Sequence, residues 1–228
     1  MDAYSIQQAI SPLRMIFWGG LLCVFDITFT STTNGQGFKC DILDDTVGAL
    51  RILIGVFKLS AFRVHDRYAA VMGFVRVVSV LALLDTIRAH FVTPLPSVIQ
   101  LAIHILGILR LAAIIAFCVA MRWLCEAARL HYEARSWAFS TALFFIIYVI
   151  PLGALYLMLA GAAITGKPFG FDLGPAGLLL LPVFALPLIH LFISTSRMKR
   201  AAEFALYSSW DEPPEEEPSQ GIQSDPGP

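Results

Sequence analysis

Charged residues are scarce in this chain of 228 residues: only 14% are Asp, Glu, Lys or Arg, whereas 57% are hydrophobic. Soluble domains carry roughly 25% charged residues, so this chain has too few charges to cover a surface that faces water. The formal net charge is −1, which gives no indication of nucleic-acid binding. The composition therefore indicates a protein whose main solvent is lipid.

Cysteine pairs and the motifs of soluble enzymes are also missing. The four cysteines show no metal-ligand spacing with one another or with histidine, which excludes the common zinc motifs. The sequence has no phosphate-binding glycine loop and no HExxH or GxSxG motif, and spacing pairs no nucleophile with a base. We therefore expect no catalytic, cofactor-binding or metal site.

Apolar segments long enough, or nearly so, to cross a bilayer as helices occur six times, each crossing needing about 20 residues. They are continuously apolar rather than alternating, which favours helices over barrel strands. We expect an all-α transmembrane bundle over residues 1–207 and a disordered, acidic, proline-rich tail over 208–228. The expected spans are Leu13–Thr30, Ile42–Phe62, Ala69–Ile87, Ser97–Met121, Trp137–Ile164 and Ala176–Ser196.

The distribution of lysine and arginine predicts the orientation. Eight of these residues follow the sixth span or lie in the second and fourth connections, and two more, Arg14 and Lys58, lie at the ends of the first two spans on the same side, which makes ten. The other connections hold three, and three lie deeper within the spans. Basic loops resist translocation, so we expect both chain ends and the ten-charge side in the cytoplasm, beneath the cell (inner) membrane. Residues 122–136 lack Gly and Pro and pair Arg with Glu at i,i+4 spacing, which predicts a cytoplasmic helix continuing the fourth span.

The first segment is interpreted as a retained anchor, because no clean small-x-small cleavage site follows it. From the end of this segment onward, residues 25–60 read FDITFTSTTNGQGFKCDILDDTVGALRILIGVFKLS. This stretch resembles a group of uncharacterised bacterial multi-pass membrane proteins with a pattern like FDILPDFIGYLLIxIGLxxLS. The resemblance covers about a sixth of the chain, and Asp44 and Arg51 depart from the pattern. It implies a bacterial cell membrane and no particular activity. Matching positions that form a candidate hairpin motif are Asp41, Asp45, Gly48 and Gly55.

Gly48, Arg51 and Gly55 fall on one face of the second expected helix, together with Asp44 and Lys58. Small residues on a helix face allow a neighbouring helix to approach closely. We therefore interpret this face mainly as a packed interior stripe.

Ionisable residues within spans are the main functional candidates, because a charge at the bilayer centre costs roughly 3 kcal/mol. In the outer half they suggest a polar path for protons or ions; the alternative is an Asp26–Arg51 ion pair that fastens the first hairpin. In the inner half two arginines have no acidic residue at the same expected depth. They suggest an anion or lipid-phosphate site, or else side chains that snorkel to headgroups. The candidates are Asp26, Arg51, Asp85 and His104 in the outer half, and Arg76 and Arg110 in the inner half.

Three functions remain open. The first is transport of a small solute, ion or proton, and the second is a non-catalytic scaffold that binds a protein partner through the cytoplasmic helix or the tail. An intramembrane enzyme ranks third, and in every case the lipid bilayer is a partner. A wet cavity lined by Asp26, Arg51 and His104 would favour transport. A dry interior filled by Leu, Ile and Phe, with a conspicuous surface on the cytoplasmic helix, would favour partner binding.

Overall fold

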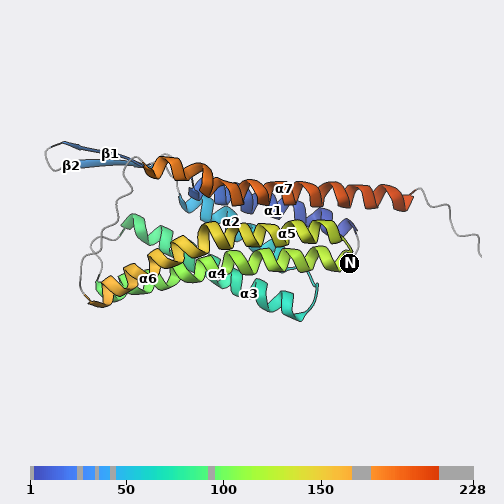
Figure 1. Ribbon diagram of the computed structural model, residues 1–228, viewed down its shortest axis with the longest axis horizontal. Helices are drawn as coiled ribbons and strands as arrows, with labels where there is room; N and C mark the ends of the chain where they lie inside the picture. The colour runs from blue at the N-terminus through green and yellow to red at the C-terminus, as the bar shows by residue number, and fades with distance from the viewer. Residues whose placement is uncertain are drawn as a thin grey trace, which may run out of the picture.

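Helices account for nearly all of this computed structural model, which describes residues 3–24, 28–33, 36–41, 45–91, 96–165 and 176–210. They form one elongated bundle, and a two-stranded hairpin projects from one of its ends (Figure 1). The elements are α1 (Ala3–Val24), β1 (Thr28–Thr33), β2 (Gln36–Asp41), α2 (Asp45–Ser60), α3 (Asp66–Phe91), α4 (Ser97–Ala127), α5 (His131–Phe144), the π-helical turn η1 (Phe145–Val149), α6 (Ile150–Thr165) and α7 (Ala176–Trp210).

Helices that follow one another in the chain pack side by side. α1 contacts α2, α2 contacts α3, α3 contacts α4, and α4 contacts both α5 and α6. α7 closes the bundle because it packs against both α1 and α5. The side chains that fill the centre are apolar, and the largest of those with no exposed surface include Ile6, Leu13, Leu59, Met72, Met121 and Trp137.

Three helical segments are long and apolar enough to cross a membrane: Asp66–Ala89, Ser97–Ala127 and His131–Thr165. In their most apolar stretches only 17%, 28% and 11% of the residues are buried inside the bundle. Most of these residues therefore point outward, which would be unfavourable in water and is favourable in lipid. The structure confirms the expectation of a helical membrane protein at this level.

The first connection contains a β-hairpin that an all-α fold does not include. α1 runs from Ala3 to Val24 and β1 begins at Thr28, so the expected first span, Leu13–Thr30, begins inside α1 but is wrong at its end, which lies in a strand. The strands pair antiparallel from Thr28 opposite Asp41 to Thr33 opposite Gln36. The threonines of β1 favour a strand, and the intervening Asn-Gly is the dipeptide preferred in two-residue hairpin turns.

Residues 122–136 do not form the single continuous helix that the sequence predicts. α4 extends to Ala127, and the chain then reverses at Ala128–Leu130, where Arg129 has a φ of 60°. The N–H of Leu130 donates to the carbonyl of Cys125 at 2.9 Å, which is the Schellman helix end with arginine at the position that glycine usually takes. No Gly or Pro marks this reversal in the sequence, so the local pattern gave no signal for it.

The last two helical runs also differ from the expected segments. His131–Thr165 is one run in which η1 ends at Val149, two residues before Pro151. Proline has no N–H to donate to the preceding turn, so a wider π turn is a natural adjustment there. α7 continues to Trp210, past the domain boundary expected at residue 207. The proposed tail from residue 211 onward lies outside the described residues.

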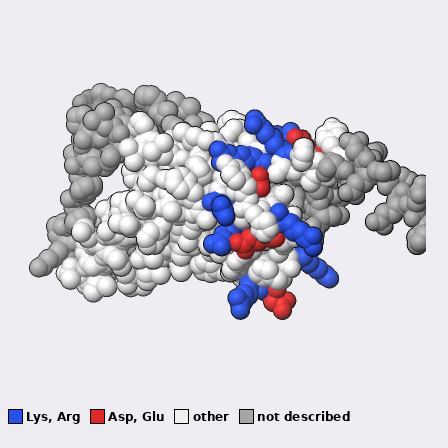
Figure 2. Space-filling model, turned by 45° about the vertical axis from the view of Figure 1, so that its right-hand side comes forward, with Lys and Arg blue, Asp and Glu red and all other residues white. Residues whose placement is uncertain are grey.

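Charged side chains gather toward one end of the bundle on the face shown in Figure 2, and the opposite half of that face is almost free of them. In Figure 1 the corresponding end holds the α2–α3 connection, the α4–α5 turn and the C-terminal part of α7. These are the segments that carry most of the basic residues in the sequence. The face shown in Figure 2 is therefore electrostatically asymmetric along the long axis of the bundle.

Candidate functional site

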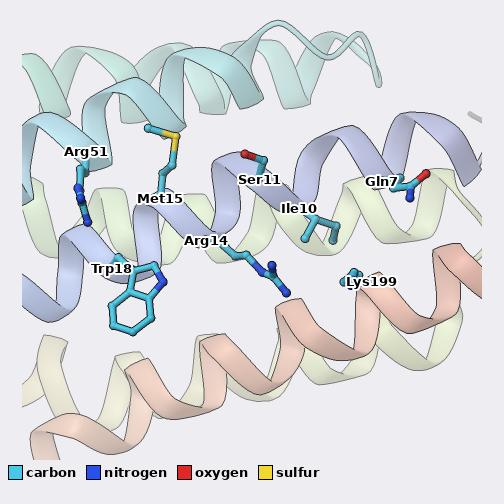
Figure 3. A pocket seen from close by; sticks show the side chains of 8 residues that line it. All are labelled: Gln7, Ile10, Ser11, Arg14, Met15, Trp18, Arg51 and Lys199. Atoms are coloured by element: carbon cyan, nitrogen blue, oxygen red, sulfur yellow. The ribbon is translucent and has the colours of Figure 1, made fainter.

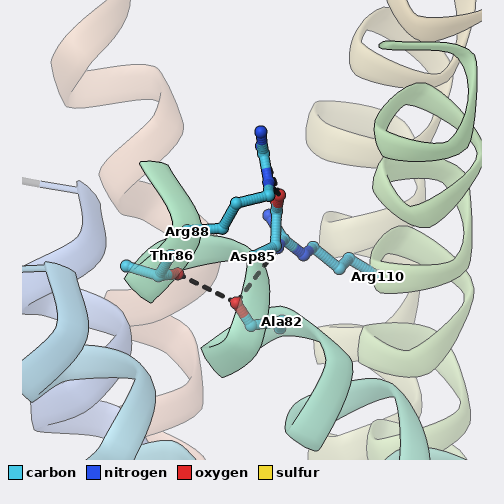
Figure 4. Close-up of polar contacts among 5 residues, drawn as sticks. All are labelled: Ala82, Asp85, Thr86, Arg88 and Arg110. Carbon is cyan, nitrogen blue, oxygen red and sulfur yellow. Dashed lines mark hydrogen bonds and ion pairs between the residues drawn. The ribbon is translucent and has the colours of Figure 1, made fainter. Parts of the chain in front are cut away.

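Asp85 is the centre of an ion-pair cluster between α3 and α4 (Figure 4). Its Oδ1 accepts hydrogen bonds from Arg88 Nε at 3.0 Å and Arg88 Nη2 at 2.6 Å, and its Oδ2 accepts one from Arg110 Nη2 at 2.7 Å. Arg110 Nη2 also donates to the carbonyl of Ala82 at 3.2 Å. Both carboxylate oxygens of Asp85 are therefore engaged by arginine, and the side chain is only 14% exposed.

This cluster corrects the prediction that no acidic residue lies at the depth of Arg110. Side chains on a helix tilt toward its N-terminus. In the neighbouring antiparallel helices α3 and α4, Asp85 and Arg110 therefore lean toward each other along the axis. The long arginine side chain closes the difference in depth that a count of residues suggests.

The residues expected to form a polar path do not share one site. Arg51 is exposed on α2, His104 is half-buried on α4 without a hydrogen bond to any described residue, and Asp85 is held by its two arginines. Asp26 lies outside the described residues, so its ion pair with Arg51 stays a prediction. Arg76 forms no ion pair with a described acidic residue; its guanidinium lies 5.4 Å from the centre of the Phe57 ring.

The glycines of the candidate hairpin motif lie where α1 and α2 touch. A Cβ added to Gly48 would come within 2.8 Å of the Gly19 carbonyl, and one added to Gly55 within 2.8 Å of the Pro12 carbonyl. Asp45 opens α2, and Asp41 ends β2. Gly48 and Gly55 thus lie at a close helix–helix contact, as expected of small residues in a packed stripe, whereas Arg51 and Lys58, assigned to the same interior face, are exposed.

A buried polar network between α5 and α7 has no counterpart among the expected sites. The Oγ atoms of Ser136 and Ser194 are 2.8 Å apart, and Ser140 Oγ lies 2.8 Å from His190 Nδ1 and 3.2 Å from Ser194 Oγ. The sequence signal was present, since Ser136/Ser140 and His190/Ser194 are both i,i+4 pairs that line one face of their helices.

The network brings together a potential nucleophile, Ser140, and a potential base, His190, which the sequence spacing alone did not pair. Ser140 and Ser194 have no exposed surface, and Ser136 is also buried, so a substrate could not reach these hydroxyls in this conformation. Hydroxyl and imidazole groups that bond across helices are a common means of joining transmembrane helices. The arrangement is therefore that of a buried hydrogen-bond network that holds α5 and α7 together.

Two open grooves lie at the charged end of the bundle. The first, of about 510 Å³, lies among α1, α2 and α7 and includes Arg14, Arg51 and Lys199. The second, of about 720 Å³, lies beside the α2–α3 connection and includes Lys58 and Arg63. Every charged residue that lines either groove is basic, so both grooves favour anions.

Comparison with known protein families, characterised proteins and solved structures finds no match to this chain. The resemblance of the first hairpin to bacterial multi-pass proteins accordingly stays a prediction. Within the described ranges, no group of three His, Cys, Asp or Glu residues is placed to hold a metal ion.

Proposed function

We propose that this chain is a six-span protein of the cell membrane, with both ends in the cytoplasm, that binds a protein partner without catalysis. α1, α2 and α7 supply the three spans beyond the segments Asp66–Ala89, Ser97–Ala127 and His131–Thr165. The ten-to-three division of basic residues supports the orientation, since the α2–α3 connection, the α4–α5 turn and the C-terminal part of α7, which carry most of the ten, lie at the end where the charges gather (Figures 1 and 2).

The observation that carries the partner-binding proposal is the free end of α7. This helix has 35 residues and is about 52 Å long at the standard rise, whereas the hydrocarbon core is about 30 Å thick. Figure 1 shows α7 reaching beyond the rest of the bundle at the charged end. Its last turns therefore extend past the bilayer on the proposed cytoplasmic side.

This projecting end carries exposed aromatic side chains on one face. Phe204 and Tyr207 are each 76% exposed, whereas Met198 and Ala202 are buried against the bundle. The buried face fixes the helix, and the aromatic face has no partner among the described residues. Exposed aromatics on a water-facing surface are the residues that dominate protein–protein interfaces. The extension expected at residues 122–136 is thus provided instead by α7.

The centre of the bundle supports partner binding over transport. The side chains between the described helices are mainly Leu, Ile, Phe and Met, and the acidic group at Asp85 is already neutralised by arginine. A path for ions needs polar groups that line one continuous space. Arg51, Asp85 and His104 lie on three different helices and do not line one groove together.

Proton or ion transport is the second candidate, and the buried network of Ser136, Ser140, Ser194 and His190 is the observation in its favour. Linked hydroxyl and imidazole groups can relay protons through a helical bundle. Proton flux into vesicles containing the purified chain, abolished by His190→Ala, would place this candidate first.

A site-specific crosslink tests partner binding directly. A photoreactive phenylalanine analogue replaces Phe204 in the full chain in its native membrane. We expect one discrete protein adduct that is lost with Tyr207→Ala, because the two aromatics share a face. Phe145→Ala is the matched control, since Phe145 is exposed on the membrane-level helix and its loss should leave the adduct intact. An adduct that forms in equal yield with and without Tyr207→Ala would contradict the proposal.

A further inference from the structure

The groove among α1, α2 and α7 brings three cationic side chains together from distant parts of the sequence (Figure 3). Arg14 comes from α1, Arg51 from α2 and Lys199 from α7. Arg14 points into the space between α1 and α7, where Lys199 also lies, and Arg51 lies beside Trp18 (Figure 3). Gln7 and Ser11 add polar groups along the same wall.

The positive charge in this groove is only partly balanced. Lys199 Nζ is 3.1 Å from Glu203 Oε1, one turn along α7. Arg14 and Arg51 form no ion pair with any acidic residue that the structure describes. Arg14 and Lys199 lie near each other, and Arg51 lies farther along the groove beside Trp18 (Figure 3). Like charges that line one groove repel one another, and an anion bound in the groove relieves that repulsion.

We propose that this groove binds a phosphate group, carried by the headgroup of an anionic phospholipid. Arginine forks match phosphate oxygens with paired hydrogen bonds, and lysine supplies a point charge. Basic pockets between transmembrane helices on the cytoplasmic side are typical sites for anionic headgroups. Lys199 lies just beyond the apolar part of α7, where headgroup phosphates are expected, and Arg51, from the middle of α2, lines the deeper part of the groove rather than the outer half of the bundle as expected from the sequence.

The apolar parts of the groove fit a lipid better than a free anion. Ile10, Met15 and Trp18 line it alongside the cations, and a half-exposed tryptophan is typical of the interface between headgroups and acyl chains. The neighbouring surface of α2 is apolar and exposed at Val47, Leu50 and Ile54. The phosphate would therefore sit among the cations while the acyl chains pack on the lipid-facing side of the bundle.

Thermal unfolding of the full chain in mild detergent tests the site. The probes are phosphatidylglycerol, phosphatidylcholine and inorganic phosphate, each titrated separately. We expect phosphatidylglycerol to raise the unfolding temperature saturably, and Arg14→Gln and Arg51→Gln each to weaken its apparent binding about tenfold, because each removes a charge-assisted hydrogen bond. Arg76→Gln is the matched control, since Arg76 is an exposed membrane-level arginine outside the groove.

The charge-retaining variants Arg14→Lys and Arg51→Lys distinguish loss of lipid binding from loss of folding. They should keep most of the lipid effect when the glutamine variants lose it. Stabilisation by inorganic phosphate alone, with no added effect of phosphatidylglycerol, would keep a phosphate site but overturn the lipid as its source. Equal stabilisation by phosphatidylcholine, or an equal phosphatidylglycerol effect in all variants including Arg76→Gln, would overturn the proposal. None of these outcomes depends on a protein partner at α7.

Discussion

At the residue scale, Asp85 shows how a membrane protein can hold several charges at one place. One carboxylate accepts hydrogen bonds from two arginines, one on its own helix and one on the next. Burying either arginine alone next to lipid would cost free energy, whereas the ion pairs with Asp85 partly offset the charges within one polar cluster. The cluster therefore joins α3 to α4 away from the end of the bundle where most charged side chains gather in Figure 2.

Replacing Asp85 with Asn should weaken this junction. We expect the free energy of unfolding in detergent to fall by about 2 kcal/mol, because hydrogen bonds to charged groups contribute roughly 1.5–3 kcal/mol each. The double variant Asp85→Asn/Arg110→Gln should lose less than the sum of the single variants, since Arg110 is then not left unpaired.

Glu126→Gln is the matched control for this measurement, because it breaks an exposed i,i+4 pair with Arg122. Exposed pairs of this kind contribute about 0.3–0.5 kcal/mol. Strict additivity of the Asp85 and Arg110 variants would show that the two side chains do not interact in solution.

At the scale of elements, the contact between α1 and α2 depends on glycine. Gly19, Gly48 and Gly55 leave no room for a side chain, because an added Cβ would meet backbone oxygen on the facing helix within 2.6 to 2.8 Å. Backbone cannot move aside as a flexible side chain can. The two helices would have to separate along the whole contact.

Gly48→Ala and Gly55→Ala should each destabilise the protein by about 1–3 kcal/mol, the usual cost of adding volume to a packed interior. Gly73→Ala is the matched control, since a Cβ there would meet nothing within 4 Å. In α3 that change should be neutral or stabilising by up to about 1 kcal/mol, because alanine favours a helix. Thermal unfolding of the three variants in one detergent measures the difference; similar losses at all three positions would contradict the close contact.

At the scale of the whole molecule, the separation of charged and apolar ends predicts how the chain sits in the membrane. Reporter fusions after Lys39, Arg88 and Lys167 should report an external position, and fusions after Arg67, Arg135 and Arg200 a cytoplasmic one. Removal of the first helix from the mature protein would leave five spans and reverse the position of the N-terminus. A cytoplasmic signal from the fusion after Arg88 would contradict the predicted external position of the connection between α3 and α4.

Composition and local pattern were sufficient to predict the membrane setting and much of the helical structure. Each apolar residue contributes its own transfer free energy, so a long run predicts a helix in lipid without knowledge of its neighbours. This is why Asp66–Ala89, Ser97–Ala127 and His131–Thr165 were predictable, apart from their ends. The predicted ends of the segments were wrong where the local backbone conformation departs from a helix. Threonines and Asn-Gly favoured a hairpin after α1. Arg129 adopted a left-handed conformation that its residue type does not indicate.

Only the tertiary structure decided which polar residues meet. Arg110 with Asp85, Ser140 with His190, and the basic groove all join residues that are far apart in the chain. Such contacts depend on the rotation of each helix about its axis and on the axial offset between neighbours, and one apolar run fixes neither. The sequence by itself therefore determined that this protein belongs in lipid, whereas helix packing determined where its charges are neutralised and where they remain available to bind an anion.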